Sequence, residues 1–307
     1  MKLELPAPSV ASTPSARLSL LASAWITTLA VSNLPNILIQ ELHLSLPISL
    51  LTLKLILLVG FFGLTFIWQA ARPLRLYFAI FVILILVEPL SAWIGATDQW
   101  RGWFSGSAFS TQMLSTQLLR LGTALIMLAA LALIYRRRSA FFFALGEVQA
   151  TAAPIPHFID QPLSWGRLGW ISALCITLGT LAFLLAFGQA PLDRMAQILP
   201  LLPFVLLFAA LNAFSEETLY RGALLAPLHT AVGSTHALLL TAALFGLWHF
   251  YGVPYGVIGV IMSGLLGWYL GKSMLETRGL FWAWFIHFWQ DVAIFAFIAA
   301  GSITPGG

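Results

Sequence analysis

Long apolar runs recur along this 307-residue chain, and they constrain its fold more than any other feature. A helical run of about 18 residues or more can span a hydrocarbon core about 30 Å thick. Only 8% of the residues are charged, against about 25% in a soluble domain, so the chain has too few charges to cover a water-facing surface. The sequence therefore predicts an all-α, polytopic transmembrane bundle with about eight or nine spans.

Nine candidate helices account for these runs. Their expected ranges are 18–39, 46–68, 76–96, 113–135, 168–188, 199–226, 236–251, 253–271 and 280–300. The first contains Asn33, Pro35 and Asn36, and the seventh is short, which are features less typical of a span. Most arginines and lysines of the loops lie before the first helix or in every second connection between helices. Basic loops of this kind face the cytoplasm. The N-terminus is therefore expected in the cytoplasm and, with nine spans, the C-terminus outside it.

The chain divides into four expected regions. They are a polar tail (1–17), an N-terminal four-helix membrane region (18–138), a cytoplasmic connection (139–167) and a C-terminal membrane unit (168–302). The connection begins with "SAFFFALGEV", which is expected to lie on the membrane surface as an amphipathic helix. The basic residues are dispersed rather than gathered in a patch, which argues against a nucleic-acid partner. Because Cys175 is the single cysteine, an intramolecular disulfide is excluded.

Three charged residues fall inside the expected N-terminal spans. Lys54, Glu88 and Arg120 lie in the second, third and fourth helices. A charge at the centre of a membrane helix costs about 2.5–3.5 kcal/mol on insertion, so each one needs a partner or a function. A Glu88–Arg120 or Glu88–Lys54 ion pair would explain them structurally, and direct roles in substrate handling are the alternative.

The C-terminal unit places charges at helical spacing in "EETLYR". Glu217 and Arg221 are four residues apart and are expected to form an ion pair on one helix face. Glu216 lies about 100° around the helix, where that arginine does not pair with it. A carboxylate without a structural partner inside a membrane is a candidate for chemistry.

Later helices bring further polar groups to a similar depth. With a rise of 1.5 Å per residue, His249, His287 and Asp291 are expected near the level of Glu216. Asp291, four residues after His287, is expected to accept its hydrogen bond and fix its tautomer. Glutamate and histidine can together deprotonate water, and a second histidine can donate to the oxyanion formed when water attacks a carbonyl. The implied reaction is amide hydrolysis without a serine or cysteine nucleophile.

Three motifs stand in order on these helices: "EETLYR" fits EExxxR, "FGLWH" fits FxxxH, and "HFWQD" fits Hxxx(N/D). On these motifs the chain resembles the CPBP family, which contains the type-2 CAAX prenyl endopeptidases and the Abi bacteriocin-processing and immunity proteins. The resemblance covers about residues 199–300. It implies an intramembrane endopeptidase in the lipid bilayer, with a membrane-anchored or lipid-modified protein or peptide as substrate. It also implies a bacterial inner membrane.

The resemblance assigns roles by motif position. The implied catalytic residues are Glu216, His249, His287 and Asp291, and the implied supporting residues are Glu217, Arg221 and Phe245. Glu216 would be the base that activates water, assisted by His249. The last motif position is often asparagine in the family, and as a carboxylate Asp291 is expected to orient His287 rather than donate to an oxyanion.

A metal and two other functions stay open at this point. The four implied catalytic residues could form a zinc site, but the chain has no H-E-x-x-H, so a metal-free glutamate mechanism is favoured over a zinc-dependent one. One alternative function is a non-catalytic immunity or scaffold protein of the same family. The other is a proton-coupled transporter, because intramembrane Glu, His and Arg also form proton relays. The transporter is less favoured because the chain shows no internal repeat.

Overall fold

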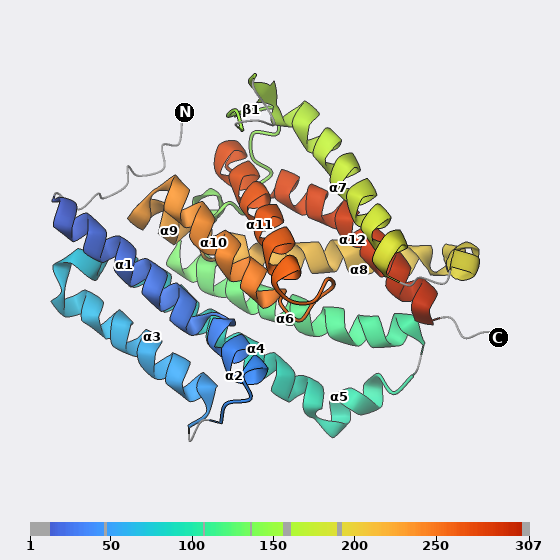
Figure 1. The fold of residues 1–307 in the computed structure, drawn as a ribbon, viewed down its shortest axis with the longest axis horizontal. Helices are drawn as coiled ribbons and strands as arrows, with labels where there is room; N and C mark the ends of the chain where they lie inside the picture. Colours follow the sequence, from blue (N-terminus) through green and yellow to red (C-terminus); the bar gives the residue numbers. More distant parts are fainter. Residues whose placement is uncertain are drawn as a thin grey trace.

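The computed structural model describes residues 13–45, 48–106, 108–135, 137–155, 161–188 and 192–302 (Figure 1). Most of the predicted polar tail lies outside these ranges. Within them the chain is a bundle of helices with one pair of two-residue strands. The predicted all-α class is confirmed.

Six α-helices form the N-terminal part of the bundle. They are α1 (Pro14–Val31), α2 (Leu34–Glu41), α3 (Leu50–Ile67), α4 (Arg75–Ala96), α5 (Asp98–Trp103) and α6 (Phe109–Ile134). A 3₁₀ helix, η1 (Gln69–Leu74), leads into α4. The axes of α1 and α2 are bent by 46° at their junction. Pro35 lies in the first turn of α2, and because proline has no N–H to continue a helix, the chain breaks there.

The C-terminal part contains the remaining long helices. They are α7 (Trp165–Phe187), the 3₁₀ helix η3 (Leu192–Leu201), α8 (Leu202–Glu216), the π-helix η4 (Glu217–Gly222), α9 (Leu225–Val232), α10 (Ser234–Trp248), α11 (Val257–Thr277) and α12 (Phe281–Ser302). The segments from η3 to α9 follow one another as a single 37-residue apolar stretch, Ala196–Val232.

Seven helical stretches in the described part of the chain are long and apolar enough to span a membrane, or up to eight if α1 and α2 count as one bent span. The protein is therefore an integral membrane protein. Of the expected eight or nine spans, the described residues support at most eight, with α1 and α2 counted together. The seventh expected helix, α10, has only 15 residues, or about 22 Å, which is short of a hydrocarbon core about 30 Å thick.

Helix α6 connects the two halves of the bundle, because it packs against both α4 and α8. Helix α12 contacts α7, α8 and α11, and α10 lies along α11 (Figure 1). Small residues permit the close approach of α10 and α11. A Cβ added at Gly246 on α10 would clash with the carbonyl oxygen of Val260 on α11, and one at Gly271 would lie 2.9 Å from the Leu238 side chain.

The connection between α6 and α7 folds back onto the protein. Its elements are the 3₁₀ helix η2 (Arg138–Phe141) and the antiparallel strands β1 (Thr151–Ala152) and β2 (Leu163–Ser164). Phe141 and Phe142 are buried, and the backbone N–H of Glu147 donates to the carbonyl of Thr277 at 2.7 Å. The expected amphipathic surface helix is therefore wrong: the segment forms only a short 3₁₀ helix, and Phe141 and Phe142 pack into the core instead of facing lipid.

Candidate active site

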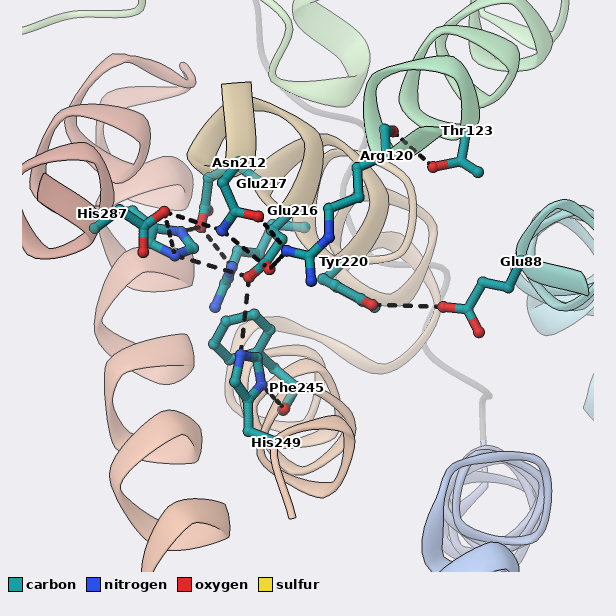
Figure 2. A network of polar contacts seen from close by, with 12 residues as sticks. Glu88, Arg120, Thr123, Asn212, Glu216, Glu217, Tyr220, Phe245, His249 and His287 are labelled. Carbon is teal, nitrogen blue, oxygen red and sulfur yellow. Dashed lines mark hydrogen bonds and ion pairs between the residues drawn. The ribbon is translucent and has the colours of Figure 1, made fainter. Parts of the chain in front are cut away.

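The four implied catalytic residues come from three different helical elements (Figure 2). Glu216 is the last residue of α8, His249 follows the end of α10, and His287 lies in α12 together with Asp291. A π-helical segment, η4, begins at Glu217, directly after Glu216. Within it the N–H of Ala223 donates to the carbonyl of Thr218, five residues earlier. π segments are rare and frequently mark functional sites. The two glutamates at this boundary contact different arginines, Glu216 with Arg120 and Glu217 with Arg221.

The two carboxylate oxygens of Glu216 differ: one accepts hydrogen bonds from neighbouring side chains, and the other accepts none from the described residues. Oε1 accepts from Arg120 Nη1 at 3.1 Å and from Asn212 Nδ2 at 3.2 Å. Oε2 is buried and has no hydrogen-bond partner among the described residues. It lies 3.9 Å from His249 Nε2 and 3.7 Å from His287 Nε2. The structure thus brings this carboxylate and the two predicted histidines together.

Both histidine rings turn the same nitrogen toward Glu216. Nδ1 of His249 lies 2.8 Å from the carbonyl oxygen of Phe245, which can only accept, so Nδ1 carries the hydrogen. Nδ1 of His287 donates in the same way to Glu217 Oε1 at 2.7 Å. In each neutral ring Nε2 is therefore the free acceptor, and it faces the unpaired oxygen of Glu216.

The supporting residues form a buried clamp behind His287. Arg221 Nη1 donates to Glu217 Oε1 at 2.5 Å, and both residues are fully buried. The Arg221 guanidinium also lies 3.9 Å above the ring of Phe245, a cation–π contact. The predicted Glu217–Arg221 ion pair is confirmed, and Glu217 holds an arginine and a histidine at once.

The predicted orienter of His287 is wrong. Asp291 Oδ2 lies 3.7 Å from His287 Nε2, which is beyond hydrogen-bond distance, whereas Glu217 makes the 2.7 Å bond to Nδ1. Asp291 instead accepts from Asn212 Nδ2 at 3.0 Å across the α8–α12 interface. Spacing of four residues places two side chains on one face, but the short Asp291 side chain reaches the neighbouring helix rather than the ring.

Asn212 is a member of the site that sequence reasoning missed. Its Oδ1 accepts from Arg120, and its Nδ2 donates to both Glu216 and Asp291. One amide therefore joins α6, α8 and α12. A signal for it does exist in the sequence, because Asn212 is a polar residue in an apolar stretch, four positions before Glu216 and on the same helix face.

Of the two ion pairs considered for Glu88, the one with Arg120 does not form among the described residues. Arg120 reaches Glu216 instead, while Glu88 accepts from the Tyr220 hydroxyl at 3.5 Å (Figure 2). Among the described residues, Lys54 also forms no ion pair with Glu88. Arg120 thus brings a charge from the N-terminal helices into the C-terminal site.

The site is charged, mostly buried and open on one side. Its charged groups are three carboxylates and two guanidiniums, from Glu216, Glu217, Asp291, Arg120 and Arg221. With neutral imidazoles their formal sum is minus one, so one added proton would neutralise the set. The side chains of Arg120 and His249 are 48% and 33% exposed, against 5% for His287, so the site is reached from the side of the first two.

The donor types at this site suit zinc, but their arrangement does not fit it. In the part of the chain that the structure describes, no group of three or more His, Cys, Asp or Glu is placed to hold a metal ion. The facing atoms of Glu216 and the two histidines are 3.7 and 3.9 Å apart, against about 3.4 Å between tetrahedral zinc ligands. One water molecule can bridge such separations with hydrogen bonds of about 2.8 Å.

The fold and the site define a polytopic membrane protein with a buried glutamate–histidine centre. Residues 198–293 match the family model described as type II CAAX prenyl endopeptidase, Rce1-like. This segment is thus similar to the CAAX protease family that the three motifs indicated, and all three motifs lie within the matched residues. No curated protein and no solved structure matches the chain significantly. The N-terminal helices, including α6 with Arg120, lie outside the matched segment.

Proposed function

We propose that the protein is an intramembrane endopeptidase that hydrolyses a peptide bond near a membrane-anchored or lipid-modified segment of its substrate. The family match supports a protease. The observation that carries the proposal is the unpaired, buried Oε2 of Glu216, which faces Nε2 of His249 and of His287. A carboxylate held in this way is a general base aimed at a shared water molecule.

In the first step, the water molecule loses a proton to Glu216 Oε2 as its oxygen attacks the carbonyl carbon of the substrate. His249 Nε2 accepts the other hydrogen of the water and so directs the oxygen lone pair to the carbon. The proton that neutralises the site resides on His287, which then donates from Nε2 to the oxyanion. Glu217, behind the ring, offsets the positive charge, as the aspartate does in a Ser-His-Asp triad.

In the second step, the tetrahedral intermediate collapses and the carbon–nitrogen bond breaks. Glu216 returns its proton to the leaving nitrogen, so one water molecule is consumed and a carboxyl group and an amine are produced. Arg120 and Asn212 act as positioning residues in both steps, because they hold Oε1 and thereby aim Oε2. Asp291 acts through its hydrogen bond with Asn212. No step of this mechanism passes through a metal.

We also propose that the N-terminus faces the cytoplasm of a bacterium. With α1 and α2 as one span, the connections that follow α3 and α6 lie on the N-terminal side of the membrane. These connections carry Arg72, Arg137 and Arg138, and basic loops of this length remain cytoplasmic. The bacterial inner membrane follows from the family resemblance.

The proposal is tested by comparing protein termini by mass spectrometry in host cells that carry the wild-type protein or Glu216→Gln at equal expression. Glutamine keeps the size of the side chain and cannot act as a base, so cleavage should fall by about 10³-fold. Glu41→Gln is the matched control, because Glu41 is an exposed carboxylate on α2 and should leave cleavage intact. New termini that appear equally with Glu216→Gln would overturn the peptidase and favour a non-catalytic membrane protein.

A further inference from the structure

A polar cavity lies among the N-terminal helices, and its wall carries charges of both signs. Its volume is about 340 Å³, within the range of small-ligand sites. Lys54 on α3 supplies the positive charge and Glu88 on α4 the negative one. Asn33 and Asn36 add amides, and the other lining residues are apolar apart from the indole N–H of Trp248. Such a wall is complementary to a ligand that itself carries both charges.

The cavity lies close to the ends of the helices that form it. Lys54 is four residues after the start of α3 and Ala92 four residues before the end of α4, so both are about 6 Å inside a helix end. The layer that holds lipid headgroups is roughly 5–7 Å thick on each side of the hydrocarbon core. Trp93 and Trp103, near the end of α4, are exposed, and exposed tryptophans are enriched at the membrane interface. The cavity is therefore at the depth of the headgroups.

The cavity opens at the surface of the bundle. Its lining residues Asn36 on α2, Leu51 on α3 and Ala92 on α4 are exposed, whereas Lys54 and Ile85 are buried behind them. Few residues of α3 are buried, and Figure 1 shows this helix at the edge of the bundle. The opening thus faces the surrounding lipid, and a lipid headgroup has access to the two charges from the bilayer.

Lys54 supplies a donor to this cavity. The residue is only 7% exposed, and its ammonium donates to the carbonyl of Ser32 at 2.6 Å and to the side chain of Asn36. These are its hydrogen-bond partners among the described residues, and an ammonium has three hydrogens, so one remains for a ligand. Both acceptors come from the break between α1 and α2. Irregular backbone at membrane depth is tolerated where it lines a cavity, so the break is an independent sign of a site here.

Glu88 supplies an acceptor to the same cavity. Among the described residues its carboxylate accepts one long hydrogen bond, from the Tyr220 hydroxyl at 3.5 Å, so most of its acceptor positions are available to a ligand. Glu88 and Lys54 do not pair with each other in the described part of the chain, and each charge is costly inside the bundle without a counter-charge. A ligand whose anion contacts Lys54 and whose cation contacts Glu88 supplies both counter-charges at once.

We propose that this cavity binds the headgroup of a zwitterionic phospholipid with a primary amine, that is, of phosphatidylethanolamine. The phosphate accepts the remaining hydrogen of Lys54, and the ammonium donates to Glu88. The acyl chains leave through the opening and lie along the apolar outer surface of α3. Trp248 lines the cavity and directly precedes His249, so a bound lipid contacts the helix end that carries a residue of the proposed active site. The assignment of the lipid site does not rest on the proposed function.

The two charges also distinguish this headgroup from other common ones. Phosphatidylcholine carries the same charges, but its quaternary ammonium has no N–H to donate to Glu88. Phosphatidylglycerol has a phosphate for Lys54 but no cation, so its negative charge would lie beside an uncompensated Glu88. The cavity is therefore expected to select ethanolamine over choline and over glycerol.

The test is native mass spectrometry of the purified full-length protein in a neutral detergent, with dioctanoyl lipids as probes. The affinity for the first bound lipid is the readout. Phosphatidylethanolamine should bind at least about tenfold more tightly than phosphatidylcholine or phosphatidylglycerol, because hydrogen bonds to charged groups are among the strong ones. Lys54→Met should weaken its binding at least about tenfold. Glu88→Gln should remove the preference for ethanolamine over choline.

Lys272→Met is the matched control for Lys54→Met. Lys272 is also 7% exposed, but it pairs with Glu276 on α11 and does not line the cavity. Its replacement should leave the affinity and the order of the three lipids unchanged. If Lys54→Met does not fold, the order of the lipids on the wild-type protein, and its loss with Glu88→Gln, still decide the matter.

Three results would overturn the proposal. The first is equal binding of phosphatidylethanolamine and phosphatidylcholine by the wild-type protein. The second is equal binding of phosphatidylethanolamine by the Lys54→Met and Lys272→Met proteins. The third is binding of O-phosphoethanolamine, which lacks acyl chains, as tightly as the lipid, which would make the cavity a site for a soluble phosphate compound. Since no cleavage is measured, each of these results leaves the peptidase proposal standing.

Discussion

The N-terminal helices and the C-terminal unit place their charges in different surroundings. In the first region the two cations Arg75 and Lys54 make local contacts: Arg75 donates to the carbonyl of Thr65 ten residues away, and Lys54 donates to the nearby break between α1 and α2. In the second region they are distant, as between Glu217 and His287, which are 70 residues apart. Local contacts can be lost one at a time, whereas the members of a shared cluster depend on one another.

Helix α6 carries a cation across this division. Its sequence position groups it with the N-terminal helices, but it packs on α8 and its Arg120 contacts Glu216. The site therefore takes one of its charges from outside the segment that matches the family. Four substitutions or treatments can break or sharpen this contrast between the two regions.

The largest effect is expected from Arg221→Met. Removing one partner of a buried ion pair leaves the Glu217 charge uncompensated, which should lower the free energy of unfolding by about 3–5 kcal/mol. Arg75→Met is the matched control, because Arg75 also lies over a phenylalanine ring, 4.0 Å from that of Phe66, but its hydrogen bonds are to uncharged groups. Denaturant titration in detergent measures both. Equal losses of unfolding free energy would show that a buried arginine stabilises the two regions to the same extent.

Arg120→Met should follow in size, but in activity rather than stability. Loss of the contact to Oε1 lets Glu216 turn away from the histidines, and kcat should fall by about 100-fold, or about 2.7 kcal/mol, with KM little changed. The side chain is 48% exposed, so the variant should fold. Arg101→Met, on α5, controls for loss of an arginine. An unchanged kcat would show that Arg120 does not contribute to the active site of the C-terminal unit.

Gly267→Ala should have a smaller effect on stability. A Cβ at Gly267 would lie 3.1 Å from both the Arg221 guanidinium and the Phe245 ring, so the clamp must shift, at a cost of about 1–3 kcal/mol. At Gly63 on α3 an added Cβ has nothing within 4 Å, so Gly63→Ala should be tolerated. The midpoints of thermal unfolding of the two variants provide the comparison. A larger loss at Gly63 would mean that packing in α3 is the tighter of the two.

The smallest effect is expected from metal removal. Since the facing atoms of Glu216 and the histidines suit a bridging water, cleavage by the purified protein should survive prolonged treatment with EDTA or 1,10-phenanthroline. The assay is the rate of peptide cleavage before and after dialysis against the chelator. Loss of activity that added zinc restores would show that the site holds a metal.

Local patterns carried most of the fold and part of the site. Each of the nine expected ranges is largely helical, although the first is broken into α1 and α2, because apolar length is a local property of the sequence. The Glu217–Arg221 pair was predictable for the same reason, since residues four apart share one helix face. The length of α10 was not predictable, because apolar residues continue past its end into a turn that begins at His249.

The sequence by itself determined the class of the molecule, the order of its helices and the three motifs that converge on Glu216. Only the tertiary structure decided which groups pair across helices: Arg120 with Glu216, Glu217 with His287, and Asp291 with Asn212. The physical reason is that helix periodicity fixes the face on which a side chain lies. Its partner depends on the angle and distance at which helices pack, and those are set by contacts between residues far apart in the chain.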